Sequence, residues 1–547
     1  MKAYFYTLSV MLFVAACLLP FHKTPWTTFG SEMLTFLSAC ALVLATFYKE
    51  KFLIAKPQWL PALLLIIPTF QLLAGQILYF SNALLCTAYI LFFWVMIVTG
   101  YNLAQQQGRV KVFKLFSATV IVIGLLSCVI AILQWLQLNT AFYPYMNILK
   151  GNRPYANFAQ PNNLATFITI GLFGVLYFYE KRIAPSLVLV PMALIFILTI
   201  ALTQSRTAWV VCLFTLGYLA IKQFGQAKRF GFLRLLAWVA IFIGTIFVLP
   251  YLNQLIEIVS PQQVTETASV VERASSGYLR LDMWNQALVA ITQQPWVGYG
   301  WNQTGIAQIA AFDLYPSREW YKSAHNVILD LLIWNGIPLG GLILLYFAGW
   351  LYWLNKGVRD AESVVATLMV CAILIHSMLE YPIHYAYFLL PMGFLLGFIQ
   401  SQYKDLPEFN LKPAIVYGFT VLSFVMLAMV YRDYDLYKQQ SVLVNKKQPL
   451  TVEQQQVLDQ KLWVLTQFND RIWWIGLNPT TKLSDAELEH IRLMVANLAS
   501  RYDIEKYAQV LAYNGKIKEA EHQLWILNTL HRMNKKYEDL LPSSVAK

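Results

Sequence analysis

The sequence predicts an all-α polytopic membrane protein with about 13 transmembrane helices, a large extracytoplasmic loop and a helical C-terminal domain. Three observations predict this fold class. Hydrophobic residues make up 58% of the 547 residues, and charged residues make up 13%, against about 25% in soluble domains. Apolar runs recur from the first residues to about residue 431. They are continuous rather than alternating, which favours helices over barrel strands.

Each predicted span is an apolar run of roughly 17 to 25 residues, long enough to cross a hydrocarbon core of about 30 Å as a helix. Short polar loops separate the runs. We expect spans at about 3–21, 29–48, 61–80, 83–100, 114–137, 162–180, 184–203, 207–223, 235–252, 326–354, 362–379, 385–402 and 413–431.

Lys and Arg fall unevenly between alternate loops. If the N-terminus is cytoplasmic, the short loops on the opposite side hold Lys23, Lys150, Arg153 and Arg206. The cytoplasmic loops then hold Lys49, Lys51, Lys56, Arg109, Lys111, Lys114, Lys181, Arg182, Lys222, Lys228, Arg229, Arg234, Lys356, Arg359, Lys404 and Lys412. An excess of Lys and Arg marks the cytoplasmic side. The net charge of +12 therefore follows from topology rather than from nucleic-acid binding.

The composition changes at about residue 432, which divides the chain into two predicted domains. Residues 1–431 form a transmembrane domain that includes an extracytoplasmic loop, 253–325. Residues 432–547 are polar, charged and helical in pattern. We expect them to form a soluble helical domain on the same side as the loop, with Trp463, Trp473 and Trp474 in its core.

Polar side chains crowd the entrance of the span at 162–180. The preceding segment reads RPYANFAQPNNLA and holds Arg153, Gln160 and Asn162. A helix N-terminus has unpaired amides and a partial positive charge, so it favours phosphate. The alternative is an ordinary capped helix after a polar turn.

The turn TQSRT (203–207) places Arg206 between two spans with almost no loop. An arginine at that depth is costly unless it pairs or binds an anion. The alternative is extension to lipid headgroups.

The large loop predicts an amphipathic helix from Tyr278 to Ile291, with Arg280 in its first turn beside Asp282. The alternative role for Arg280 is a surface ion pair, which contributes little stability. The helix leads to PWVGYGWN (295–302). Its aromatic residues are typical of a sugar-stacking surface or of a membrane interface.

His325 closes this loop within YKSAHNVILDLLIWNGIPLG (321–340), and Asn326 follows it at the start of a span. A neutral imidazole is well suited to accept a proton near neutral pH. The alternative is a histidine that makes hydrogen bonds at the membrane interface.

A later short loop, within HSMLEYPIHYAYF (376–388), places Glu380 and Tyr381 on the same side. Ionisable residues at that depth indicate function, and the alternative is a polar plug that satisfies helix ends.

Gln160, Arg206, Arg280, His325 and Tyr381 come from five segments that the predicted topology places on one side of the membrane. The sequence has no zinc spacing, Walker loop, dinucleotide fingerprint or nucleophile elbow. Arginines, amides and a histidine suit transfer from a diphosphate leaving group, with arginine charge in place of a metal ion. We therefore expect an enzyme that uses no metal and no cofactor.

The segments RPYANFAQPNNLA, TQSRTAW, RLDMWNQAL to PWVGYG, AHNVILDLLIWNGIPLG and HSMLEYP occur in this order. Their combination resembles the O-antigen ligase and polymerase superfamily. Within it the sequence is most similar to bacterial O-oligosaccharyltransferases of the pilin-glycosylating, PglL-like branch. The resemblance covers about residues 150–400 in detail. Ala156 and Ala159 stand where many relatives carry glycine, and Trp334 stands where ligases often carry glutamate.

The resemblance implies a multi-pass protein of the bacterial inner (cytoplasmic) membrane with its active site facing the periplasm. It implies en bloc transfer of a preassembled glycan from undecaprenyl diphosphate to a Ser or Thr hydroxyl of a pilin-like protein. Membrane lipids are further expected partners, and nucleic acid is not. The expected site residues are His325, Tyr381 and Gln160 for catalysis, Arg206, Arg280 and Arg153 for the diphosphate, and Asn162, Asn326 and Glu380 for sugar or helix-end amides.

Two alternatives stay open at this point. An O-antigen ligase or polymerase of the same superfamily would differ in using a saccharide acceptor. A lipid or glycan transporter would also have many spans with interior polar residues. Transporters usually contain internal repeats and ionisable residues near the bilayer midplane, and the sequence shows neither pattern.

Overall fold

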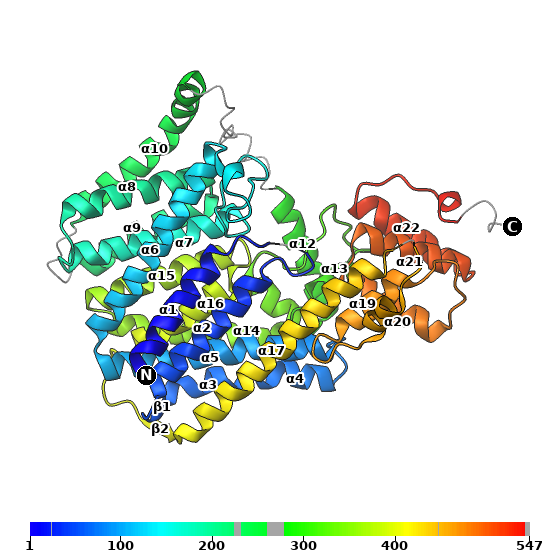
Figure 1. The fold of residues 1–547 in the computed structure, drawn as a ribbon, viewed down its shortest axis with the longest axis horizontal. Coiled ribbons are helices and arrows are strands. Elements are labelled where there is room, and N and C mark those ends of the chain that lie inside the picture. Colours follow the sequence, from blue (N-terminus) through cyan, green and yellow to red (C-terminus); the bar gives the residue numbers. More distant parts are fainter. Residues whose placement is uncertain (23, 224–230, 260–277, 447, 542–547) are drawn as a thin grey trace. The chain divides into compact units, whose positions relative to one another are not determined.

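The computed structural model describes the chain except for residues 23, 224–230, 260–277, 447 and 542–547. Part of the predicted loop 253–325, residues 260–277, thus lies outside the described residues. The described chain is mostly helical (Figure 1). It divides into two compact units. Unit 1 comprises Met1–Ala62, Leu91–Arg273 and Gly349–Val421, and unit 2 comprises Leu63–Ile90, Ala274–Ala348 and Leu422–Lys547.

Most helices of unit 1 match predicted spans. They are α1 (Lys2–Leu18), α2 (Phe29–Phe47), α6 (Arg109–Trp135), α7 (Pro161–Glu180), α8 (Ser186–Thr203), α9 (Arg206–Gln223), α10 (Phe232–Val259), α15 (Ala361–Ser377) and α16 (Ala386–Gln400). Three further helices, α5 (Phe80–Gln107), α14 (Val327–Gly357) and α17 (Pro413–Leu443), contribute residues to both units.

Among the described residues, 8 helices are long and apolar enough to cross a membrane. They are α2, α5, α6, α7, α8, α10, α14 and α17. The helices α1, α15 and α16 are apolar but shorter. The prediction of a helical, multi-pass membrane protein is therefore confirmed.

Glycines let α5 and α16 approach closely. A Cβ atom added to Gly397 would lie 1.8 Å from the carbonyl oxygen of Ile97, and one added to Gly100 would lie 2.1 Å from that of Phe394. No side chain fits at either position. Small residues that bring backbones together are a common means of helix association in membranes, where apolar side chains gain little by leaving lipid.

The predicted span at 61–80 is wrong as a single helix. This stretch contains two short helices, α3 (Trp59–Leu63) and α4 (Ile66–Leu73), and Gly75 follows with φ 74°. Pro61 and Pro68 remove backbone donors and restrict their neighbours, so an apolar composition is insufficient for one continuous helix. The structure also contains two short antiparallel strands that the sequence pattern did not predict, β1 (Phe52–Ala55) and β2 (Glu408–Leu411).

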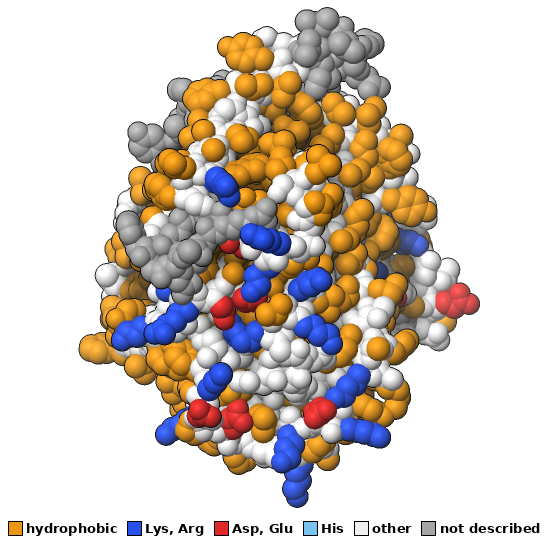
Figure 2. Space-filling view, turned by 90° about the vertical axis from the view of Figure 1, so that its left-hand side faces the viewer, with side chains coloured by type: hydrophobic (Ala, Val, Ile, Leu, Met, Phe, Trp, Pro, Cys, Tyr) orange, Lys and Arg blue, Asp and Glu red, His pale blue; other side chains and the backbone are white. Residues whose placement is uncertain are grey.

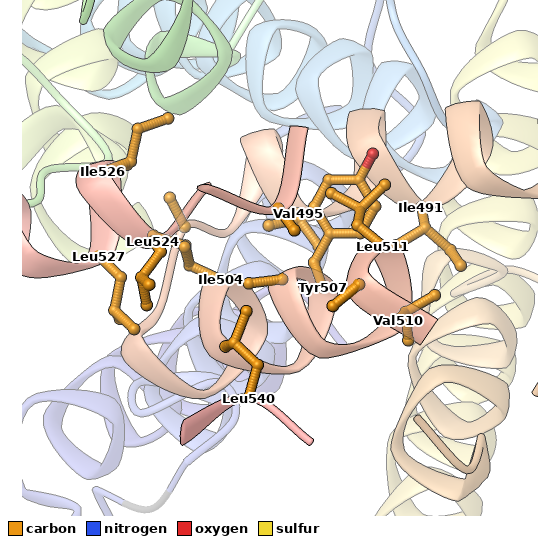
Figure 3. Packing of buried hydrophobic residues seen from close by; sticks show 14 of the residues in the cluster. Ile491, Val495, Ile504, Tyr507, Val510, Leu511, Leu524, Ile526, Leu527 and Leu540 are labelled. Atoms are coloured by element: carbon orange, nitrogen blue, oxygen red, sulfur yellow. The ribbon is translucent and has the colours of Figure 1, made fainter. Parts of the chain in front are cut away.

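Unit 2 contains α12 (Tyr278–Gln293), α13 (Thr304–Ala310), α18 (Val452–Asp459), α19 (Gln467–Gly476), α20 (Asp485–Asn497), α21 (Arg501–Tyr513) and α22 (Ile517–Leu530). The predicted amphipathic helix at 278–291 is thus confirmed. Apolar residues of the last three helices form one core (Figure 3), which includes Ile491, Val495, Ile504, Tyr507, Leu511, Leu524 and Leu527.

Phe312, from the segment after α13, belongs to the same core. Trp474 is also fully buried there. Trp463 and Trp473 are 61% and 40% exposed, so their predicted role in the core is wrong. The sequence pattern identified both residues as apolar, but it did not show that Trp473 lies on the exposed side of α19 or that Trp463 lies in the segment before this helix.

Candidate active site

The predicted site residues belong to both units. Unit 1 holds Arg153, Gln160, Asn162, Arg206, Glu380 and Tyr381, and unit 2 holds Arg280, His325 and Asn326. They include two groups, one in each unit. The arginine cluster is Arg153, Asn162 and Glu380 with the turn that carries Arg206, and the histidine turn is Ser323–Asn326.

In the arginine cluster, Arg153 links three segments of unit 1. Its Nη2 donates to Oδ1 of Asn162 at 2.9 Å, and its Nε donates to the carbonyl oxygen of Thr203 at 2.7 Å. Nδ2 of Asn162 in turn donates to Oε1 of the buried Glu380 at 3.0 Å. The structure therefore brings together the loop before α7, the first turn of α7, the end of α8 and the α15–α16 loop.

Arg206 is the first residue of α9 and follows Thr203 by only three residues. Gln204 between them has a left-handed backbone, with φ 49°, which reverses the chain tightly. Because Thr203 contacts Arg153, the turn that carries Arg206 lies beside the cluster. Two arginines predicted for the diphosphate thus come from neighbouring segments.

Gln160 is the residue that precedes α7, and its side chain does not cap the helix. Its Nε2 instead donates to Oδ1 of Asn163 at 3.0 Å. Asn163 is fully buried, and its Nδ2 donates to the hydroxyl of Tyr387 at 3.0 Å. The N-terminal end of α7 is thus tied to α16 by amide side chains.

Tyr381 follows Glu380 in the α15–α16 loop. Its ring lies 5.6 Å from that of His384. Burial, with a smaller contribution from the Glu380 carboxylate, raises the pKa of Tyr381. The phenol therefore stays protonated at neutral pH, the form that can donate a hydrogen bond.

Gln134 of α6 supports the loop before α7, a role that sequence reasoning missed. Its Oε1 accepts from the backbone N–H of Tyr155 at 3.0 Å and of Ala156 at 2.7 Å. Its Nε2 donates to the carbonyl oxygen of Ala156 at 2.9 Å. A glutamine near the end of an apolar span was the available signal. Ala156 and Ala159 have φ values of 49° and 63°, the left-handed region that favours glycine.

In the histidine turn, His325 has a left-handed backbone with φ 52°. Its N–H donates to Oγ of Ser323 at 3.1 Å. Asn326 precedes α14, and its Oδ1 accepts from the N–H of Ile328 at 3.0 Å and of Leu329 at 3.3 Å in the first turn of that helix. These two hydrogen bonds fix the start of the helix, and the predicted substrate-binding role of Asn326 stays a prediction.

Asp330, in the first turn of α14, holds the histidine turn in place. It is 2% exposed, and its Oδ2 accepts from the Ser323 hydroxyl at 2.5 Å. Its Oδ1 accepts from the Ala324 N–H and from the Thr304 hydroxyl, both at 2.9 Å. Sequence reasoning missed this residue, although a carboxylate inside the apolar run VILDLLIW was a clear signal.

Trp334 extends this network. Its Nε1 donates to the Thr304 hydroxyl at 2.8 Å, and Thr304 donates to Asp330. Trp284 of α12 donates from Nε1 to the Ala324 carbonyl oxygen at 2.9 Å. Trp334, which stands where ligases often carry glutamate, therefore helps to hold the histidine turn through Thr304 and Asp330.

The segment PWVGYGW (295–301) bridges a break in α14 at Gly336, which has φ 71°. Tyr299 N–H donates to the Ile333 carbonyl oxygen at 2.8 Å, and Ile337 N–H donates to that of Pro295 at 2.7 Å. A Cβ on Gly298 would lie 2.5 Å from the Gly336 nitrogen. The segment thus supplies hydrogen-bond partners for backbone groups that the break in α14 leaves without a helical partner.

Of the aromatic residues in this segment, Tyr299 and Trp301 are used in packing. The Tyr299 hydroxyl donates to the Ala290 carbonyl oxygen at 3.1 Å, and the Trp301 ring lies 5.6 Å from that of Trp334. Trp296 is 77% exposed. Of these three rings, Trp296 is the largely exposed one, and the sugar-stacking role stays a prediction.

Arg280 lies in the first turn of α12 and is partly exposed. Its neighbour Asp282 accepts the Tyr315 hydroxyl at 2.8 Å. In the part of the chain that the structure describes, no group of three His, Cys, Asp or Glu side chains is placed to hold a metal ion.

The fold and these groups define a multi-pass helical membrane protein with arginine, amide and histidine side chains at helix ends. Residues 191–345 match the O-antigen ligase family, and residues 364–539 match the C-terminal region of the virulence factor membrane-bound polymerase family.

Two proteins of Acinetobacter baylyi (strain ATCC 33305 / BD413 / ADP1) are similar over much of the chain. A general O-oligosaccharyltransferase is 41% identical over 534 residues, which are 97% of this chain and 93% of the relative. A ComP-specific O-oligosaccharyltransferase is 29% identical over 419 residues, 76% of this chain and 73% of that relative. The chain belongs to the bacterial O-oligosaccharyltransferases of the O-antigen ligase and polymerase superfamily, and it is a glycosyltransferase. The family predicted from the sequence is confirmed.

Proposed function

We propose that this enzyme moves a preassembled glycan en bloc from undecaprenyl diphosphate to a Ser or Thr hydroxyl of a pilin-like protein in the periplasm. The observation that carries the proposal is the 41% identity over 97% of the chain to a general O-oligosaccharyltransferase. The ComP-specific relative supports a protein acceptor. The proposed chemistry uses arginine charge and no metal ion or cofactor.

The proposed orientation is that of an inner-membrane protein with its active site toward the periplasm. The distribution of Lys and Arg between alternate short loops supports it. One face of the molecule carries a group of Lys and Arg side chains among hydrophobic ones (Figure 2). Within unit 1, Lys222 donates to the carbonyl oxygens of Asn355 and Val358 at the end of α14. Basic side chains commonly bind the last carbonyl groups of a helix in this way.

In the proposed reaction, the acceptor oxygen bonds to the anomeric carbon while the bond from that carbon to the diphosphate oxygen breaks. Undecaprenyl diphosphate leaves, and His325 takes the proton of the acceptor hydroxyl. Arg206 and Arg280 stabilise the charge that develops on the diphosphate, because guanidinium groups match phosphate geometry. The anomeric centre is inverted.

The remaining residues position these groups. Arg153 contributes charge to the diphosphate, and its hydrogen bonds to Asn162 and Thr203 fix its direction. Glu380 holds Asn162. Gln160 and Tyr381 orient sugar or phosphate oxygens. The left-handed backbone of His325 is the kind of local strain that persists where the surroundings hold a residue in place for function.

Replacement of His325 by alanine tests the proposal. The acceptor protein is isolated from cells that express wild type or variant, and its glycan is measured by mass spectrometry. His522→Ala is the matched control, because His522 is an exposed histidine of α22 that pairs with Asp313 in the segment after α13. We expect His325→Ala to lose glycosylation and His522→Ala to retain it. Wild-type glycosylation by folded His325→Ala protein would remove His325 from the mechanism.

A second candidate function is transfer to a saccharide acceptor. The match of residues 191–345 to the O-antigen ligase family favours it. Mass spectrometry of secreted pilin-like proteins from a deletion strain separates the two functions. Loss of the protein-linked glycan supports the protein acceptor, and unchanged protein glycosylation supports the saccharide acceptor.

A further inference from the structure

We propose that α7, α8, α9 and α10 bind one anionic phospholipid of the cytoplasmic leaflet, with its phosphate at Arg234 and an acyl chain in the cavity between these helices. The four helices belong to unit 1. The inference depends on the membrane orientation proposed above and is independent of the catalytic assignments.

The cavity has a volume of about 330 Å³, within the roughly 300–1,000 Å³ of ligand pockets. Most of its lining is apolar and includes Phe173 of α7, Leu189 and Ala193 of α8, and Phe242 of α10. Such a lining offers hydrogen bonds to few ligands. Its natural occupant is a hydrocarbon chain.

The cavity is long. Its lining residues on α8 extend from Ser186 to Ile200, a distance of about 20 Å at the helical rise of about 1.5 Å per residue. The wall formed by α10 is accessible from the lipid, since only 17% of the most apolar stretch of this helix is buried. An extended acyl chain can therefore enter from the side and lie along α8.

One end of the cavity is polar. Tyr179 at the end of α7, Ser186 at the start of α8 and Arg234 at the start of α10 all line it. The Arg234 Nη1 donates to the Tyr179 hydroxyl at 2.8 Å. Among the described lining residues, Arg234 is the charged one. A phosphate group with an attached acyl chain complements this arrangement of one cation at the mouth of an apolar channel.

The position of Arg234 identifies the leaflet. The end of α7 and the starts of α8 and α10 adjoin loops predicted to be cytoplasmic, and basic pockets between helices on that side bind anionic headgroups. The polyprenyl chain of the donor would place its diphosphate at the other end of the cavity, toward Ile200 and Ala208. No charged residue lines that end within the described part of the cavity, but Arg206, assigned above to the diphosphate, begins α9 two residues before Ala208. The donor chain is therefore the competing occupant, and the undecaprenyl phosphate probe below distinguishes it from the phospholipid.

Native mass spectrometry of the full-length protein, delipidated in maltoside detergent, tests this site. The probes are phosphatidylglycerol, phosphatidylcholine with the same acyl chains, and undecaprenyl phosphate. The variants are Arg234→Gln, Arg234→Lys and Ala193→Phe, in which the larger ring fills the channel. Arg359→Gln is the matched control, because Arg359 is an exposed arginine in a loop predicted to be cytoplasmic and does not line the cavity.

We expect wild type to retain one phosphatidylglycerol in preference to phosphatidylcholine. Arg234→Gln should weaken phosphatidylglycerol binding by about fivefold, the effect of roughly one basic residue at an anionic lipid surface. Arg234→Lys and Arg359→Gln should bind nearly as wild type, and Ala193→Phe should lose the bound lipid while remaining monodisperse. Equal binding of the two phospholipids, or equal binding by Arg234→Gln and Arg359→Gln, would overturn the proposal. Displacement of phosphatidylglycerol by undecaprenyl phosphate that is unaffected by Arg234→Gln would assign the cavity to the donor chain instead.

Discussion

The buried carboxylate of Asp330 accepts a hydrogen bond from the Ser323 hydroxyl at 2.5 Å, and Ser323 in turn accepts the backbone N–H of His325. This relationship holds His325 in a left-handed conformation, which is uncommon for residues other than glycine. Such strain is stable only when the surrounding contacts determine it. The position of the imidazole therefore depends on a carboxylate that lies outside the histidine turn, within α14.

Asp330→Asn should lower the rate of glycan transfer by about 10²-fold, the effect of a displacement of about 1 Å in a reacting group. The asparagine keeps the size of the side chain but offers one acceptor oxygen where the carboxylate offers two. Transfer is measured with purified enzyme at several acceptor concentrations. A loss in kcat with little change in KM indicates misplacement of His325.

Asp313→Asn serves as the control for this variant, because Asp313 is 65% exposed at its side chain and pairs with His522. It should transfer glycan at the wild-type rate. Equal activity of Asp330→Asn and Asp313→Asn would show that the buried network is unnecessary for catalysis.

Ala159→Gly should stabilise the protein by about 0.5–1 kcal/mol, because Ala159 has φ 63° and glycine adopts this conformation without steric cost. Ala156→Gly should gain less, since the Ala156 methyl group is fully buried and its removal loses packing. Thermal unfolding of the purified variants measures both effects.

Ala165→Gly provides the opposite case. Ala165 lies inside α7 and is buried, so glycine there should lower stability by about 1 kcal/mol. A loss of stability in Ala159→Gly similar to that in Ala165→Gly would contradict the left-handed conformation of the loop.

The Asn162–Glu380 hydrogen bond predicts coupled mutations. Asn162→Ala and Glu380→Ala should each reduce glycosylation. The double variant should be about as active as the less active of the two single variants. Residues in contact show interaction energies of about 0.5–3 kcal/mol. Initial rates of transfer give the cycle directly.

The control cycle combines Asn162→Ala with Glu319→Ala, because Glu319 pairs with Arg532 in unit 2. These two changes should add. Additive effects of Asn162→Ala and Glu380→Ala would mean that the two side chains act separately.

Lys506 in α21 predicts a dependence of stability on pH. Burial, helped by Arg471, lowers the pKa of Lys506 from 10.5 to about 8. Between pH 8 and 10.5 the unfolded chain binds the proton more tightly than the folded chain, so stability should rise with pH through this range. Below about pH 8 the buried charge is present in the folded protein and its cost is constant.

Thermal unfolding of the full-length protein at several pH values measures this effect. Lys506→Met should flatten the rise between pH 8 and 10.5. Lys518→Met, which changes an exposed lysine of α22, should leave the rise as in wild type. Identical pH profiles for the two variants would contradict the lowered pKa.

Much of the fold could be predicted from the sequence because long apolar runs have one stable structure in a membrane. The predicted spans became helices except at 61–80, where Pro61 and Pro68 outweighed the apolar composition, and at 326–354, where α14 is broken at Gly336. The strands β1 and β2 are 4 residues each, too short to show alternation.

The site could be predicted in part. Side-chain type and position at the ends of predicted spans indicated Arg153, Asn162 and Glu380. The structure joins these three residues by hydrogen bonds. The supporting roles of Asp330 and Gln134 could not be assigned, because the role of a buried polar side chain depends on the hydrogen-bond partners that the fold brings to it. Thr304 lies 26 residues from Asp330, and Ala156 lies 22 residues from Gln134.

The most direct test of the account is an electron cryomicroscopy structure of the full-length enzyme in a lipid nanodisc with undecaprenyl-diphosphate-linked glycan bound. We predict diphosphate oxygens within about 3 Å of guanidinium nitrogens of both Arg206 and Arg280, with the His325 imidazole facing the anomeric carbon from the opposite side. A diphosphate bound without either arginine, or an imidazole tens of ångströms from the anomeric carbon, would contradict the proposed enzyme.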